Sequence, residues 1–187
     1  MKKKIRILSL VIVLAGVLCL YTMRVVQLNT KWPAPELEVY QLGDTVEGPY
    51  GTEYTVHSAR FMSQEEGEQY YVERNRDWQQ IYLVVDVSFT NTTDRELQES
   101  FGFLSPRSGA WSNGNNPYFY TAMNESGGKY SEFVAPGETI RRTLVYNLVD
   151  VQFRDYQWPH VTERPVELII NSYPVLRVVE LFPENAA

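Results

Sequence analysis

The stretch that decides the fold is residues 81–90, which read IYLVVDVSFT. Apolar side chains occupy every second position on one face, namely Ile81, Leu83, Val85, Val87 and Phe89. The opposite face is mixed and becomes polar from Asp86 onward. A period of two is typical of a β-strand with one face against a core. The strand should end at residues 91–94, NTTD, because these side chains can bond their own backbone in a turn.

The same alternation recurs on both sides of this strand. It predicts further strands at 52–62, 140–148, 166–170 and 176–182, and shorter ones at 36–41, 70–73, 97–104, 118–122 and 130–133. The apolar positions shift between Val56 and Ala59, which predicts a β-bulge. No window carries an apolar stripe of helical length, although residues 64–76 have room for one turn or two. The body is therefore predicted to be all-β, a sandwich of seven to nine strands.

The N-terminus carries a basic cluster followed by an apolar run. Residues 2–6 read KKKIR, and the run extends from Ile7 to Met23 before Arg24. A run of about 20 residues is needed to cross a membrane, and the lysines favour a cytoplasmic N-terminus. We predict four parts: a cytoplasmic segment 1–6, a single transmembrane signal anchor 7–26, an extended spacer 27–38 with two prolines, and an extracellular domain 39–187. A cleavable signal peptide is the alternative, although no pair of small residues follows the run.

Cys19 is the only cysteine and lies inside the apolar run. A lipoprotein signal requires a small residue before the cysteine, whereas Leu18 stands here, so the sequence favours a thiol buried in the membrane. Whether Cys19 is lipidated stays open. Without another cysteine, the body cannot hold disulfides or cysteine-based zinc sites. An exported domain without disulfides suggests a bacterial protein.

Charge is distributed unevenly along the chain. Five of the 17 basic residues and none of the 23 acidic residues lie in residues 1–30. The remainder therefore holds 12 basic and 23 acidic residues, a net charge of −11. A body this acidic repels phosphate backbones, which argues against nucleic acid as a partner.

Three motifs follow one another in the body: YQLGDTV at 40–46, LVVDVSFTNTTD at 83–94 and VAPGET at 134–139. Their order resembles the uncharacterised immunoglobulin-like domains of membrane-anchored and lipoprotein exports in Gram-positive bacteria, the domains of unknown function of Firmicutes. The resemblance covers roughly residues 39–182. It implies an immunoglobulin-like β-sandwich outside the membrane and brings no catalytic residue with it. The chain departs from the lipoprotein members by lacking a good lipidation signal.

Signatures of catalysis and of metal binding are missing from the sequence. His57 and His160 are the only histidines, and neither stands in a metal-binding spacing. No Gly-x-Ser-x-Gly motif is present, and residues 105–109, SPRSG, have the composition of a loop. The acidic run 65–68, EEGE, lacks the spacing of an EF-hand. We therefore predict a protein that is not an enzyme and that has no cofactor and no metal site.

The most suggestive stretch for binding is residues 111–120, WSNGNNPYFY. Its Asn-Gly and Asn-Pro pairs favour turns, and aromatic rings beside amides suit sugar stacking or a protein hot spot. The candidate binding residues are Trp111, Asn113, Asn115, Tyr118 and Tyr120. The alternative is that these rings pack inside the sandwich.

Three functions follow from these observations. The favoured one is a non-catalytic binding or accessory module, held at the membrane and engaging an unknown envelope or membrane protein. The second is a cell-wall glycan-binding module that uses the loop from Trp111 to Tyr120. The third is an enzyme with carboxylate chemistry, which a pocket holding two carboxylates of raised pKa would support.

Overall fold

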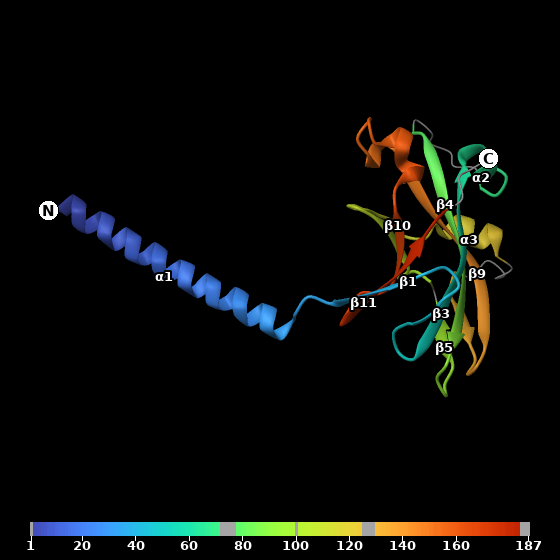
Figure 1. Cartoon of the computed structure of the whole chain (residues 1–187), viewed down its shortest axis with the longest axis horizontal. Coiled ribbons are helices and arrows are strands. Elements are labelled where there is room, and N and C mark those ends of the chain that lie inside the picture. The colour runs from blue at the N-terminus through green and yellow to red at the C-terminus, as the bar shows by residue number, and fades with distance from the viewer. Residues whose placement is uncertain (1, 72–77, 100, 125–129, 184–187) are drawn as a thin grey trace. The chain divides into compact units, whose positions relative to one another are not determined.

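The computed structural model describes residues 2–71, 78–99, 101–124 and 130–183. The chain divides into two units, Met1–Glu36 and Leu37–Ala187. The first unit is the helix α1, Lys2–Lys31, drawn in blue in Figure 1. Within α1, the 21-residue segment Val11–Lys31 is long and apolar enough to cross a membrane, as is also typical of a signal sequence.

The helix is longer than the sequence pattern predicts. It continues through Lys31, and β1 begins at Glu36, so the extended spacer predicted at 27–38 shrinks to residues 32–35. The physical reason is the position of the helix breakers, because Pro33 and Pro35 disfavour helix only at and just before themselves. Residues 27–31 hold no breaker, and the hydroxyl of Thr30 bonds the carbonyl of Val26 at 2.8 Å within the helix.

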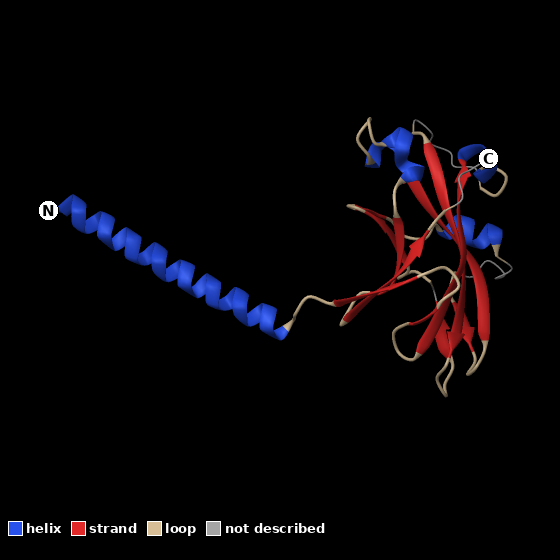
Figure 2. Cartoon of the chain, viewed as in Figure 1, coloured by secondary structure: helices blue, strands red, loops and turns tan. Residues whose placement is uncertain are grey.

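The second unit is built from β-sheets, which Figure 2 shows in red. One sheet has the order β1 (Glu36–Tyr40), β11 (Val175–Leu181), β10 (Val166–Asn171), β6 (Ser105–Ser108) and β7 (Trp111–Ser112). A second has the order β2 (Thr45–Glu47), β3 (Thr52–Ser63), β4 (Gln80–Asn91) and β9 (Thr139–Val149), and β5 (Leu97–Glu99) pairs with β8 (Glu132–Val134). The prediction of an all-β sandwich is confirmed. The eleven strands in the described ranges exceed the predicted seven to nine because β2, β5, β7 and β8 have three residues or fewer. The immunoglobulin-like topology stays a prediction.

The core lies where the alternation of β4 predicted it. Leu83, Val85 and Val87 are fully buried, together with residues of β9, β10 and β11. The predicted bulge in β3 is also confirmed, because the pairing of β3 with β4 shifts its register between Val56 and Ser58. Strands of both larger sheets thus contribute to one apolar core.

The mixed face of β4 is covered by a short helix that the sequence pattern did not predict. Helix α3 spans Pro117–Met123, so the prediction of a strand at 118–122 is wrong. The side chain of Asn116 caps this helix by accepting from the backbone N–H of Tyr118 at 2.9 Å, and Pro117 occupies the first turn. Below α3 lies a second apolar cluster, formed by Met62, Tyr82, Val84, Phe119 and Val145.

Several connections also differ from the sequence pattern. The SPRSG stretch expected to be a loop contributes strand β6, which pairs with β10 and whose Arg107 contacts Glu167 at 2.6 Å. Helix α2, Gln64–Gly67, is the single turn for which room was predicted. The strand expected at 70–73 is not formed at residues 70 and 71, and residues 72 and 73 lie outside the described ranges. Two 3-10 helices between β9 and β10, η1 (Asp150–Gln152) and η2 (Trp158–Glu163), were not predicted.

Candidate functional site

The predicted binding segment 111–120 does not form an exposed aromatic surface. Trp111 is 8% exposed and Tyr120 is fully buried, so for these two candidate residues the structure supports the alternative that the rings pack inside the sandwich. Strand β7 holds Trp111 against the core, and α3 turns Tyr120 inward, where its hydroxyl donates to Glu132 at 3.0 Å. Tyr118 is 59% exposed and stacks on Tyr71 with ring centroids 4.7 Å apart.

The two predicted asparagines attach this segment to strand β9. The amide nitrogen of Asn113 donates to the carbonyl of Asn147 at 2.7 Å. The amide oxygen of Asn115, which is buried, accepts from the backbone N–H of Val145 at 3.0 Å. Their amides therefore serve the fold, and Tyr118 is the one member of the predicted set that is largely exposed.

A different aromatic cluster forms around η1 and η2. The ring of Phe153 lies 6.2 Å from Trp111 and 5.9 Å from Trp158, and the guanidinium of Arg164 lies 6.0 Å from it. Beside this cluster is a pocket of about 490 Å³, here called the Trp158 pocket. It is lined by Gln79, Asp150, Val151, Phe153, Asp155 and Trp158.

Backbone and side-chain hydrogen bonds hold the walls of the Trp158 pocket in place. The backbone N–H of Asp150 donates to the carbonyl of Gln79 at 3.1 Å, which continues the pairing of β9 with β4. The backbone N–H of Phe153 donates to the carbonyl of Asp150 at 3.0 Å and closes η1. The indole N–H of Trp158 donates to the side-chain oxygen of Gln79 at 2.8 Å. These bonds join η1 to the residue before β4 and link the Trp158 side chain to Gln79.

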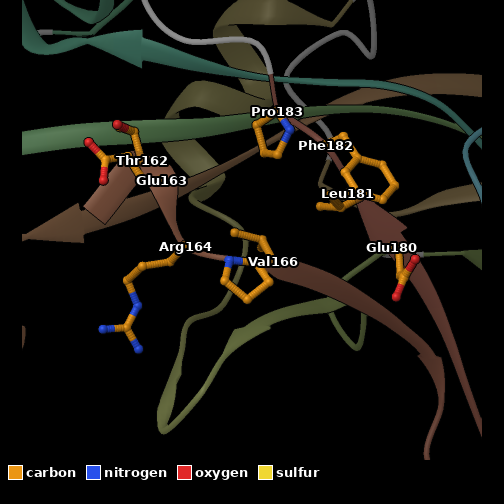
Figure 3. A pocket seen from close by; sticks show the side chains of 9 residues that line it. Thr162, Glu163, Arg164, Val166, Glu180, Leu181, Phe182 and Pro183 are labelled. Carbon is orange, nitrogen blue, oxygen red and sulfur yellow. The ribbon is translucent and has the colours of Figure 1, made fainter. Parts of the chain in front are cut away.

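A second pocket, of about 400 Å³, lies between the start of β10 and the end of β11. Figure 3 shows Arg164 and Glu180 on opposite sides of it, with Phe182 and Pro183 beside Leu181. Its wall ends at Pro183, the last described residue.

A third pocket, of about 470 Å³, lies near the turn between β2 and β3. Tyr50 and Phe103 line it and are exposed, whereas Glu99 is buried. The hydroxyl of Tyr54 donates to Glu99 at 3.0 Å, and burial raises the pKa of Tyr54 well above its ordinary value. Since Glu99 also accepts from the backbone N–H of Phe101, this carboxylate shapes the loop that follows β5.

Many charged side chains of the domain form pairs. Arg142 contacts Glu132, and Arg141 donates to Asp86 at 2.9 Å. Arg177 of β11 donates to Glu38 of β1 at 2.8 Å, and its guanidinium lies 3.1 Å from Glu47 of β2. The hydrogen bond from Arg177 lowers the pKa of Glu38.

Each histidine side chain forms a hydrogen bond with one other side chain. His57 bonds Ser88 at 2.7 Å, and His160 contacts Glu163 at 3.1 Å. Within the described ranges, no three His, Cys, Asp or Glu residues are grouped as metal ligands. The absence of a metal and of catalysis stays a prediction.

Comparison with curated proteins finds no match. Among solved structures, the chain is similar to the yjhA protein from Bacillus subtilis, at 14% identity and a TM-score of 0.46 over 76% of this chain and 98% of that one. An uncharacterized beta-sandwich protein from Clostridium difficile is 14% identical, with a TM-score of 0.48 over 78% and 95%. A conserved hypothetical protein from Bacillus anthracis is 13% identical, with a TM-score of 0.48 over 70% and 88%. Residues 36–177 match the family described as Domain of unknown function (DUF5028), which spans most of the β-sandwich, and the chain therefore belongs to this family.

Proposed function

We propose that this protein is a membrane-tethered, extracellular binding domain that acts without catalysis on a partner in the membrane or the cell envelope. The observation that carries the proposal is the apolar segment Val11–Lys31, joined to strand β1 through only residues 32–35. A linker of four residues keeps a domain close to its tether. The lysines at residues 2–4 favour a cytoplasmic N-terminus, and hence a β-sandwich of immunoglobulin-like type on the outside.

Binding rather than catalysis is supported by how the charged groups are used. Arg142 with Glu132 and Arg177 with Glu38 serve as pairs that join strands. Catalytic acids and bases need neighbours that shift their pKa toward the pH at which they work. The raised pKa values of Tyr54 and Tyr120 come chiefly from burial, which keeps both phenols neutral inside the fold.

The second function, glycan binding through the loop from Trp111 to Tyr120, loses its support in that form. Stacking on a sugar needs an accessible ring face. Trp111 is 8% exposed and Tyr120 is fully buried, so neither ring offers such a face, and the exposed ring of Tyr118 is stacked on Tyr71.

Single-cysteine labelling tests the proposed orientation. Because Cys19 is the only cysteine, Cys19→Ser provides a background without thiols. In this background, Tyr156→Cys places a thiol at a position that is 66% exposed on the domain, and Lys3→Cys places one in the basic segment. A membrane-impermeant maleimide added to intact cells should label Tyr156→Cys, and Lys3→Cys should react only after permeabilisation. The labelled protein should sediment with membranes.

Two results would contradict the proposal. Labelling of Lys3→Cys but not of Tyr156→Cys in intact cells would reverse the orientation. Recovery of labelled Tyr156→Cys in the medium would show that the apolar segment is cleaved and that the domain is released. Affinity purification of the full chain from membranes, with identification of the proteins that co-purify, then finds the partner.

A further inference from the structure

We infer that the Trp158 pocket binds a pyranose sugar that carries no negative charge. This inference rests on the proposed function, because it names a ligand class for a domain proposed to act by binding. The proposed sugar site is therefore not segment 111–120 but the pocket lined by Gln79, just before β4, and by residues of the two 3-10 helices and their connection after β9.

The pocket offers the apolar ring surface that a sugar needs. Phe153 and Trp158 are only half-buried, and Trp111 supports Phe153 from the core side at 6.2 Å. The indole N–H of Trp158 already donates to Gln79. A ligand would therefore contact the carbon atoms of the indole ring rather than its N–H group. The axial C–H groups of a pyranose form a small apolar face that fits against such a ring.

The remaining polar groups accept hydrogen bonds far more than they donate them. One oxygen of Asp150 accepts from the backbone N–H of Val151 at 2.7 Å, and the carboxylate of Asp155 has no partner among the described residues. The side-chain nitrogen of Gln79 is the one amide donor in the lining. Such a set suits a ligand with several hydroxyl donors, which a sugar has. A proline-rich peptide also packs on aromatic rings, but it offers carbonyl acceptors and few N–H donors.

Charge narrows the class of sugar further. Asp150 and Asp155 both line the pocket, and the chain beyond residue 30 has a net charge of −11. Like charges that meet in a binding site disfavour the complex, so uronic acids and sugar phosphates should be rejected. Neutral sugars and sugars with a protonated amine remain.

Titration of the full chain in detergent micelles tests the inference. The probe is the tetramer of N-acetylglucosamine, followed by isothermal calorimetry and by tryptophan fluorescence. A second arm uses the tetramer of glucosamine, which adds positive charge. A third uses the tetramer of galacturonic acid, and a fourth a decamer of proline. We expect saturable binding of at least one of the first two and none of the last two.

Three variants locate the site. Asp155→Ala removes an exposed carboxylate without breaking any bond among the described residues, so the fold should be unchanged. It should weaken sugar binding about tenfold or more, since hydrogen bonds to charged groups are among the strongest. Trp158→Ala should abolish binding. Tyr156→Ala is the matched control, because Tyr156 is 66% exposed and adjacent but does not line the pocket.

The remaining outcomes each overturn the inference. These are failure of both amino-sugar tetramers to bind, sugar binding that Asp155→Ala leaves unchanged, and saturable binding of the proline decamer or the galacturonate tetramer at this pocket. Circular dichroism checks that each variant is folded; if Trp158→Ala is not, Asp155→Ala decides alone. The labelling of Tyr156→Cys does not depend on sugar, so failure here leaves the proposed membrane-tethered binding domain standing.

Discussion

Replacing Trp111 with alanine should destabilise the domain strongly, whereas Tyr118→Ala should have little effect. The two rings lie seven residues apart in the segment WSNGNNPYFY, where the sequence does not distinguish one ring from the other. Trp111 is 8% exposed and belongs to the main core cluster, and Tyr118 is 59% exposed. The two variants therefore compare the loss of a buried ring with the loss of an exposed ring in one segment.

The structure allows both magnitudes to be worked out. Removing a buried tryptophan side chain costs about 3–5 kcal/mol. The lost indole bond to Gln152 adds little, because the oxygen of Gln152 still accepts from the backbone N–H of Val149 at 3.1 Å. Tyr118→Ala loses mainly the stack on Tyr71, which is worth about 0.5–1.5 kcal/mol. Since a domain of this size loses about 2–4 °C in Tm per kcal/mol, Trp111→Ala should lower Tm by about 6–20 °C and Tyr118→Ala by about 1–6 °C.

Thermal melts of the full chain in detergent, followed by circular dichroism of the β-sheet signal, measure both changes. Urea titration of the same variants should give the same order of stability. A larger loss of Tm for Tyr118→Ala than for Trp111→Ala would refute the reasoning. So would a Trp111→Ala protein that melts with the parent, because Trp111 would then contribute nothing to the core.

Two further predictions concern β4 and the buried tyrosines. Val85→Asp places an unpaired carboxylate at a fully buried position and should cost several kcal/mol of stability. Asp86→Asn weakens only its exposed ion pair with Arg141 and should cost about 1 kcal/mol or less. Equal urea midpoints for the two variants would contradict the assignment of Val85 to the core face of β4. Burial raises the pKa of Tyr54, Tyr120 and Tyr146, so their neutral phenols stabilise the fold fully below about pH 10, and this contribution is lost as the pH rises toward their folded-state values. Phenolate absorbance from these three should therefore appear together with unfolding; its appearance while circular dichroism is unchanged would show that they are accessible.

The strands with the clearest alternation could be predicted from sequence because their burial depends on local periodicity. A strand that carries Leu83, Val85 and Val87 on one face has one orientation that buries all three, whatever the rest of the fold. The bulge after Val56 was visible for the same reason, because the apolar positions change phase there.

Features that depend on distant contacts were not predictable in this way. Helix α3 has seven residues, too few to show a helical stripe, and only the cap Asn116 with Pro117 signals it locally. Trp111 is buried through its strand pairing and through Phe153, which lies far along the chain. The Trp158 pocket exists because Gln80 pairs with Val149, which brings Gln79 next to the turns after β9. Without this strand register, nothing in the sequence places Gln79 beside residues 150–158.

The ion pairs of Arg177 with Glu38 and Glu47 affect how the domain would respond to mechanical force. Strand β1 is at the edge of its sheet and directly follows the four-residue linker, so any tension applied through α1 would enter the domain at β1. Arg177 holds Glu38 in this strand and Glu47 in β2, which belongs to the other large sheet. A pull on β1 would therefore load side-chain contacts to β11 in its own sheet and, through Arg177, to β2 in the other sheet. Arg177, which joins these strands in the unloaded fold, would then resist separation of β1 at the place where force is applied.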